Sequence, residues 1–234
     1  FLVPLMGSIY FGAMIVALIL NLNLVLPAFK LILVDAFNGT AIAGGTFFGV
    51  LIYGVRRGAF SNEAGMGTES LVHGVAKVSN PVKQGLVAMT GPIFDTLIIC
   101  TATALMILVS GVWETSSSQG VTLTSEAFSV LLGSLGGFIL FVCVICFGLS
   151  TIFTYSYYGA SCSRFLFGKF GMKFYIYLYI LSIFIYSIVP IDIAINIADG
   201  AFAMMAIPTL ISALWLAPKV MQASKNYFKL INNN

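Results

Sequence analysis

Charged side chains are scarce in this chain, since Asp, Glu, Lys and Arg make up only 8% of its 234 residues. A water-soluble domain carries roughly 25% charged residues, so this composition excludes an ordinary globular protein. The net charge of +3 gives no indication of nucleic-acid binding. Histidine is nearly absent: His73 is the only one and belongs to no HExxH motif, and Walker A loops and nucleophile elbows are missing too. We therefore predict that the chain is not an enzyme and binds no nucleic acid.

Cysteine is also rare, and the four residues of this type lie in or at the ends of apolar runs. Cys143 and Cys146 form a CxxC pair, but no second pair or histidine lies nearby, which disfavours a metal site. Small apolar residues in a lipid-embedded helix need no further role. We therefore predict no metal site at these cysteines.

Hydrophobic residues dominate what remains, with 59% of the positions and a mean hydropathy of +1.03. Strand-like alternation is absent, and lipid favours helices because they satisfy their own backbone groups. Each crossing needs about 20 mostly apolar residues, so we predict one all-α membrane domain over residues 1–234 with about six transmembrane helices. The chain begins inside an apolar run without Met, which predicts that an N-terminal part is missing. The apolar stretches are Phe1–Pro27, Thr40–Val55, Val82–Val112, Gly136–Gly159, Phe174–Val189 and Ile193–Ala217.

The basic residues orient the predicted helices. Ten of the eleven fall in alternate loops, and so on one face, which the positive-inside rule makes cytoplasmic. The opposite loops hold the remaining basic residue, Lys30, together with Asp35, Glu114, Glu126 and Asp192. Both ends of the chain are then predicted to lie on the cytoplasmic side of a plasma (inner) membrane. The ten residues are Arg56, Arg57, Lys77, Lys83, Arg164, Lys169, Lys173, Lys219, Lys225 and Lys229.

Glycines cluster in the second apolar stretch, where Gly44, Gly45 and Gly49 fall near the expected bilayer centre. Glycine costs about 1 kcal/mol relative to Ala inside a helix. An unwound segment that presents backbone groups to a solute would justify this cost, as in transporters with broken helices. Close helix packing through small residues is the alternative.

A charged segment follows this stretch. Arg56 and Arg57 precede Ser61, Asn62 and Glu63, and either Ser61 or Asn62 suits the N-cap of a following helix. The arginines and carboxylates form either a gating ion-pair network or a solvated loop.

Two aspartates lie within the apolar stretches. Asp95 is twelve residues beyond Lys83, about 18 Å along a helix, and is therefore deep in the membrane. A charge there costs at least about 2.5 kcal/mol, so Asp95 must face a partner or water, unless it is a protonated or hydrogen-bonded structural residue. Asp199 is closer to the outer face.

Hydroxyl groups concentrate in the fourth stretch, where Ser150 and Thr151 fall in the inner half of the bilayer. Hydroxyl and carbonyl oxygens are the hard ligands that a small alkali cation requires. Both side chains can instead bond back to carbonyls of their own helix.

Several motifs occur in order over most of the chain. They are GVRRGAFSNEAGMGT at Gly54–Thr68, NPVKQGLV at Asn80–Val87, DTLIICTATA at Asp95–Ala104, IADG at Ile197–Gly200 and MAIP at Met205–Pro208. Together these motifs resemble those of the alanine or glycine:cation symporter family, also called the sodium:alanine symporters.

The resemblance implies the inverted-repeat fold of the bacterial leucine transporter, with the chain holding the last helix of the first repeat and all of the second repeat. The second stretch is then a broken helix, and Ser150 and Thr151 are sodium ligands. Arg56, Arg57, Asn62 and Glu63 become gate residues, beside the intramembrane Asp95 and Asp199. The implied substrate turn comprises Gly44, Gly45, Thr46, Phe47, Phe48 and Gly49.

The implied function is sodium-coupled symport of a small neutral amino acid, alanine or glycine, by a complete protein that includes the missing N-terminal half. Proton coupling through Asp95 is the first alternative. A truncated membrane scaffold without transport activity is the second.

Overall fold

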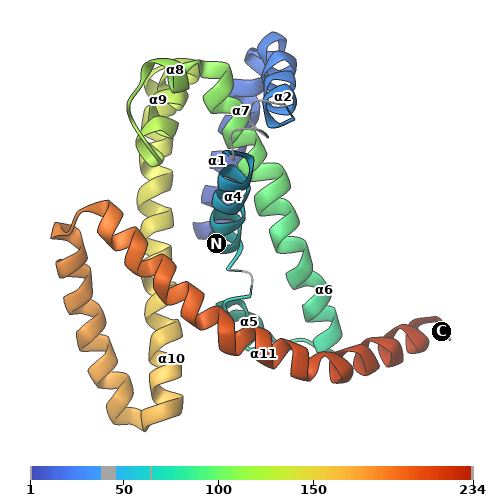
Figure 1. The fold of residues 1–234 in the computed structure, drawn as a ribbon. Helices are drawn as coiled ribbons and strands as arrows, with labels where there is room; N and C mark the ends of the chain where they lie inside the picture. Colours follow the sequence, from blue (N-terminus) through green and yellow to red (C-terminus); the bar gives the residue numbers. More distant parts are fainter. Residues whose placement is uncertain (1, 38–45, 64, 233–234) are drawn as a thin grey trace. The chain divides into compact units, whose positions relative to one another are not determined.

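The computed structural model describes residues 2–37, 46–63 and 65–232 (Figure 1). Every regular element in these residues is a helix, which confirms the prediction of an all-α chain. The chain divides into two compact units. The first unit holds Phe1–Arg56 and Phe94–Thr154, and the second holds Arg57–Ile93 and Tyr155–Asn234.

The first unit is organised around α1, α7, α9 and the beginning of α10. Side chains from all four meet in a core in which Met14, Met106 and Phe128 are fully buried. The π-helix η1 leads directly into α7. The bounds of the elements are α1 Leu2–Leu20, α2 Leu22–Ala36, α4 Thr46–Asn62, η1 Ile93–Cys100, α7 Thr101–Ser110, α8 Val112–Thr115, α9 Val121–Leu132 and α10 Ser134–Ile188; α4 and α10 both continue into the second unit.

The first apolar stretch ends differently from its prediction. The prediction places the end at Pro27, but α2 runs through Pro27 to Ala36, and the break between α1 and α2 lies at Asn21. There the Asn21 amide donates to the Leu18 carbonyl over 3.2 Å and the Leu24 amide donates to the Asn21 carbonyl over 2.9 Å. These tighter three-residue bonds turn the chain, whereas a helix continues past a proline by giving up one hydrogen bond.

The third stretch forms a continuous helical rod from Pro81 to Ser110, through α6 (Pro81–Pro92), η1 and α7. Asn80 caps its start, since its Oδ1 accepts from the Val82 amide over 2.9 Å. Gly111, with a φ of 70°, ends the rod. These bounds agree with the predicted Val82–Val112.

The loop between the third and fourth stretches contains helices that sequence patterns did not predict. Glu126 on α9 accepts from the Ser118 hydroxyl over 2.6 Å. Hydrogen bonds from Ser116 and Ser118 hold the pKa of the Glu126 carboxyl below its usual value. These bonds fasten the segment after α8 to α9.

The fourth and fifth stretches are the two limbs of α10, which meet at Gly168 (Figure 1). Gly168 has a φ of 68°, a conformation that glycine adopts without strain. The predicted loop between Gly159 and Phe174 is wrong, because the chain stays helical on both sides of this one residue. The limbs pack where Tyr175 lies directly over Gly159.

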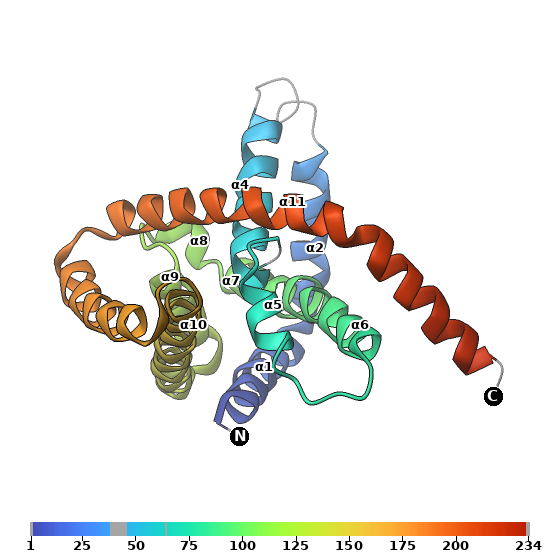
Figure 2. The same ribbon diagram turned by 90° about the horizontal axis from the view of Figure 1, so that it is seen from below.

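The second unit also contains α5, α6 and α11 (Ile191–Asn232), and the loop between α5 (Thr68–His73) and α6 is visible in Figure 2. The prediction ends the last apolar stretch at Ala217, but α11 continues through Pro208 and Pro218 to Asn232. Gly67 packs against Thr209 on α11. Its φ of 86° and this close approach both suit a residue without a Cβ.

Four helices in the described residues are long and apolar enough to cross a bilayer. They are Val3–Leu20, Pro81–Ser110, Ser134–Ile188 and Ile191–Ile231. Each limb of α10 on its own reaches the roughly 20 residues that a crossing needs. The number of crossings, about six, and the leucine-transporter-like repeat stay predictions.

Replacing Gly159 with Ala is expected to lower the stability of the α10 hairpin. A Cβ at this position overlaps the Tyr175 ring, so the ring must move, at a cost of about 1–3 kcal/mol. The measurement is thermal unfolding of the detergent-purified protein by intrinsic fluorescence. Replacing Tyr175 with Ala in the G159A background should recover part of the loss.

Gly12→Ala is the matched control, because a Cβ on this α1 glycine has no neighbour within 4 Å. Higher helix propensity should leave that variant equally stable or stabilise it by up to about 1 kcal/mol. If G159A and G12A unfold at the same temperature, the packing of Tyr175 on Gly159 is wrong.

Candidate functional site

A cavity of about 680 Å³ opens in the first unit between α1, η1, α9 and α10. Its wall is mainly apolar and contains Val3, Leu140 and Val144. Four polar side chains interrupt that wall, and Gly7 and Gly148 leave room in it. An apolar cavity with a few convergent polar groups is the usual form of a small-molecule site. The polar residues are Tyr10, Asp95, Thr124 and Thr151.

Asp95 reaches the cavity from an irregular turn. It is half-buried and lies in η1, directly after Pro92. Proline has no amide hydrogen and crowds the carbonyl four residues earlier, so the helix loses one hydrogen bond at this point. The chain widens into a π-helix, a form that is frequent at functional sites. The deviation from α-helix thus coincides with the predicted intramembrane carboxylate.

Thr151 faces the same cavity from α10. Its hydroxyl and that of Ser150 both donate to the Phe147 carbonyl over 2.8 Å. This is the back-bonded arrangement, which leaves the lone pairs of each hydroxyl oxygen available to a cation. The structure therefore brings Thr151 and Asp95 to one cavity, whereas Ser150 is not among the residues that line it.

Tyr10, like Thr124, is a cavity residue that sequence patterns missed. Its hydroxyl lies 3.1 Å from Thr103 Oγ1, and Thr103 donates to the Ile99 carbonyl over 2.9 Å. Its ring stacks on Phe128 at 5.6 Å and meets Phe147 edge-on at 6.0 Å. A single tyrosine in an apolar helix is too common to stand out, and only these contacts across the core mark it.

The predicted substrate turn stays a prediction, and part of its backbone is helical. Gly44 and Gly45 lie outside the described residues, as do the side chains of Thr46 and Phe47. The backbone from Thr46 to Gly49 belongs to α4 and is helical, where the prediction places a non-helical turn. Phe48 is exposed.

The predicted gate residues lie at the C-terminal end of α4. Asn62 is not an N-cap, because α4 includes it and its Nδ2 donates to the Gly58 carbonyl over 2.9 Å. Ser61 is likewise inside α4, and the next helix starts at Thr68. Arg56 is exposed and Arg57 half-buried in the last turns of α4.

Glu63 follows α4 with a φ of 52°, a left-handed conformation that is uncommon outside glycine and asparagine. Its carboxylate lies close to Tyr155 and Tyr158 on α10. The two tyrosine rings lie 5.5 Å apart and Tyr158 is buried. This acid–phenol cluster in the second unit is a further feature that the sequence did not reveal. The predicted arginine–glutamate gate stays a prediction. Asp199, half-buried on α11 in the same unit, does not line the cavity described above.

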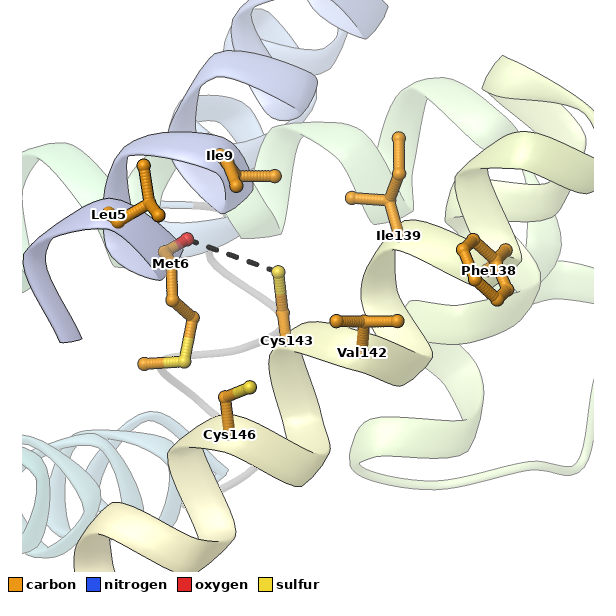
Figure 3. A pocket seen from close by; sticks show the side chains of 8 residues that line it. All are labelled: Leu5, Met6, Ile9, Phe138, Ile139, Val142, Cys143 and Cys146. Carbon is orange, nitrogen blue, oxygen red and sulfur yellow. Dashed lines mark hydrogen bonds between the residues drawn. The ribbon is translucent and has the colours of Figure 1, made fainter. Parts of the chain in front are cut away.

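The CxxC pair lines a smaller pocket of about 290 Å³ between α1 and α10 (Figure 3). The Cys143 thiol points to the Met6 carbonyl, with Sγ and O 3.9 Å apart. Apolar side chains surround both sulfurs. Among the described residues no group of three or more His, Cys, Asp or Glu is placed to hold a metal.

The model of the sodium:alanine symporter family matches residues 1–234. The chain belongs to this family. It is 34% identical over 99% of its length to the sodium/alanine symporter AgcS of Methanococcus maripaludis, and 33% identical over 97% to the probable sodium/glutamine symporter GlnT of Bacillus subtilis. A sodium/proton-dependent alanine carrier protein of Bacillus sp. strain PS3 is 31% identical over 66%.

The chain spans about half the length of the curated relatives it matches, with 52% of AgcS and 48% of GlnT covered. The family and these relatives are transporters. Membership of this family and the long apolar helices together make the chain a multi-pass membrane protein.

A cysteine at position 151 is expected to react rapidly with a water-soluble thiosulfonate reagent, because the cavity holds polar groups that keep it hydrated. The experiment uses a protein in which the four native cysteines are replaced by alanine, reconstituted in lipid. The rate of labelling is measured by mass shift.

Leu149→Cys is the matched control, since Leu149 is exposed on the same helix and does not line the cavity. In lipid, the thiol introduced at position 149 is surrounded by hydrocarbon. It should be labelled at least tenfold more slowly than the thiol at position 151. Equal rates at positions 149 and 151 would contradict a hydrated cavity beside Thr151.

Proposed function

We propose that the full-length protein containing this chain imports a small neutral amino acid, alanine or glycine, together with Na⁺ across the plasma membrane. The observation that carries the proposal is the cavity that Asp95 and Thr151 share. It combines a carboxylate, a hydroxyl oxygen and an apolar wall, which is the chemistry needed for an alkali cation beside a small solute. The family and its sodium symporters support the same reading.

The ion is assigned to the oxygens of this cavity. Na⁺ takes hard oxygen ligands, and the Thr151 oxygen keeps lone pairs while its proton is held by the Phe147 carbonyl. The negative charge of the Asp95 carboxylate offsets that of the ion in a mainly apolar surrounding. The remaining ligands are proposed to come from the part of the protein beyond this chain. Ser150 stays a predicted ligand that the variants below separate from Thr151.

The amino acid is assigned to the space beside the ion. A zwitterion has no net charge, so coupling to Na⁺ gives one positive charge per cycle, and membrane potential adds about 2.3 kcal/mol per 100 mV. Gly44 and Gly45, before α4, stay predicted backbone partners of the substrate. Glu63 and the two arginines stay the proposed inner gate, which opens once the ligands are bound and the outer side is closed.

Proton coupling is the second candidate, and Asp95 is the observation that favours it. A carboxylate in an apolar cavity can carry a proton, and the Bacillus sp. strain PS3 relative is named as a sodium/proton-dependent carrier. In that case Asp95 itself is the ion site and Thr151 only positions the substrate.

Replacing Thr151 with Ala is expected to lower Na⁺-driven alanine uptake by at least tenfold, because the ion loses an oxygen ligand. Uptake is measured with the full-length protein in proteoliposomes under an inward Na⁺ gradient. Thr151→Ser keeps the oxygen and should retain most of the activity. Ser150→Ala is the matched control, since its hydroxyl makes the same bond to Phe147 but does not line the cavity.

Two results would overturn the sodium assignment. One is uptake that follows a pH gradient without Na⁺ and disappears in Asp95→Asn, which would make the proton the coupling ion. The other is activity of T151A equal to that of the wild type over the whole range of Na⁺ concentration. An unchanged alanine KM with a raised KM for Na⁺ in T151A would instead support the ion site.

A further inference from the structure

A groove of about 560 Å³ lies in the second unit between the start of α6 and the C-terminal part of α11. Its walls are apolar side chains from both helices, among them Leu86, Met89 and Val220. These three are exposed, with Met89 accessible over 70% of its surface. Lys219 and Ser224 are the polar side chains in the lining. The groove therefore combines an apolar surface with one cationic side chain, that of Lys219, and one hydroxyl, that of Ser224.

The helix that forms one wall is amphipathic beyond Pro218. Val220, Tyr227 and Ile231 recur at helical spacing on one side, and Met221 and Phe228 widen that apolar face. Lys219, Gln222, Lys225, Asn226 and Lys229 fall on the opposite arc. A basic amphipathic helix of this kind lies in the membrane interface, with its apolar face among acyl chains and its lysines at the headgroups.

Charge decides which lipid suits the groove. No Asp or Glu occurs after Asp199 in the chain, and α6 has none, but α6 carries Lys83 one turn from its start. All of these lysines belong to the face that the positive-inside rule makes cytoplasmic. The cytoplasmic leaflet of the membrane carries the anionic phospholipids, which attract basic segments close to its surface.

We propose that this groove binds one anionic phospholipid. Its phosphate lies between Lys219 and the Ser224 hydroxyl, and one acyl chain follows Leu86, Met89 and Val220 toward the hydrocarbon. A neutral lipid fills the trough equally well but leaves Lys219 without an anion. The inference depends on the orientation of the chain in the membrane and not on the proposed symport, so either can fail without the other.

The test compares phosphatidylglycerol with phosphatidylcholine of identical acyl chains, bound to the full-length protein and counted by mass spectrometry of the intact complex. The wild type is expected to retain phosphatidylglycerol preferentially. Lys219→Gln should weaken its binding roughly fivefold, the factor that corresponds to about 1 kcal/mol per lysine near the surface. Lys219→Arg keeps the charge and should bind like the wild type.

Lys169→Gln is the matched control, because Lys169 belongs to the same predicted face but lies beside Gly168 in α10, away from the groove. It should leave lipid binding unchanged. Equal losses of phosphatidylglycerol binding in K169Q and K219Q would mean that the lysines act only by general attraction to the membrane surface, which would overturn the site. Equal retention of the two lipids by the wild type would also overturn it.

A second measurement needs no variant. A phosphatidylglycerol with a photoreactive group on its acyl chain is added to the wild-type protein, illuminated, and mapped by peptide sequencing. Labels in residues 81–92 and 219–224 support the proposal. Labels spread over the other apolar helices, or none in these segments because another part of the protein covers them, would overturn it.

Discussion

Asp95 imposes the strictest requirement in this chain, because a carboxylate inside an apolar helix needs water, a cation or a hydrogen-bond donor beside it. Pro92 lies three positions before Asp95 and removes one backbone hydrogen bond from the helix. The π-helix η1, which contains Asp95, begins at the next residue. The cavity that Asp95 reaches is held open by side chains that are themselves fixed. Tyr10, for example, packs its ring against two phenylalanine rings, and its hydroxyl is hydrogen-bonded to Thr103. A rigid wall around a costly charge is the arrangement that a binding site requires.

Much of the fold follows from composition and charge placement, because lipid permits few backbone structures. The rod from Pro81 to Ser110 is predictable at both ends, since Asn80 and Gly111 are strong boundary residues. Pro27 and Gly168 show the limit of such rules. The helix passes through the proline because the loss of one hydrogen bond is tolerated, whereas a single glycine in a left-handed conformation reverses the chain between the limbs of α10.

The candidate site is less predictable than the fold, since it depends on contacts between distant segments. Asp95 and Thr151 are conspicuous in sequence as polar residues in apolar stretches. Nothing local indicates that Tyr10 joins them, because its partners lie more than ninety positions away at Thr103 and beyond. The cluster of Glu63 with Tyr155 and Tyr158 is invisible for the same reason. Glycine content does not distinguish an unwound segment from a regular helix. Gly49, for example, belongs to the predicted turn and is helical in the structure.

The turn at Gly168 has a consequence for how the chain enters the membrane during synthesis. Its two limbs are joined by one non-helical residue, and Tyr175 rests on Gly159 across them. No connecting loop is long enough for the limbs to leave the translocon independently. They are therefore expected to pass into lipid together as a helical hairpin, with Arg164, Lys169 and Lys173 near the tip that the positive-inside rule predicts to be cytoplasmic.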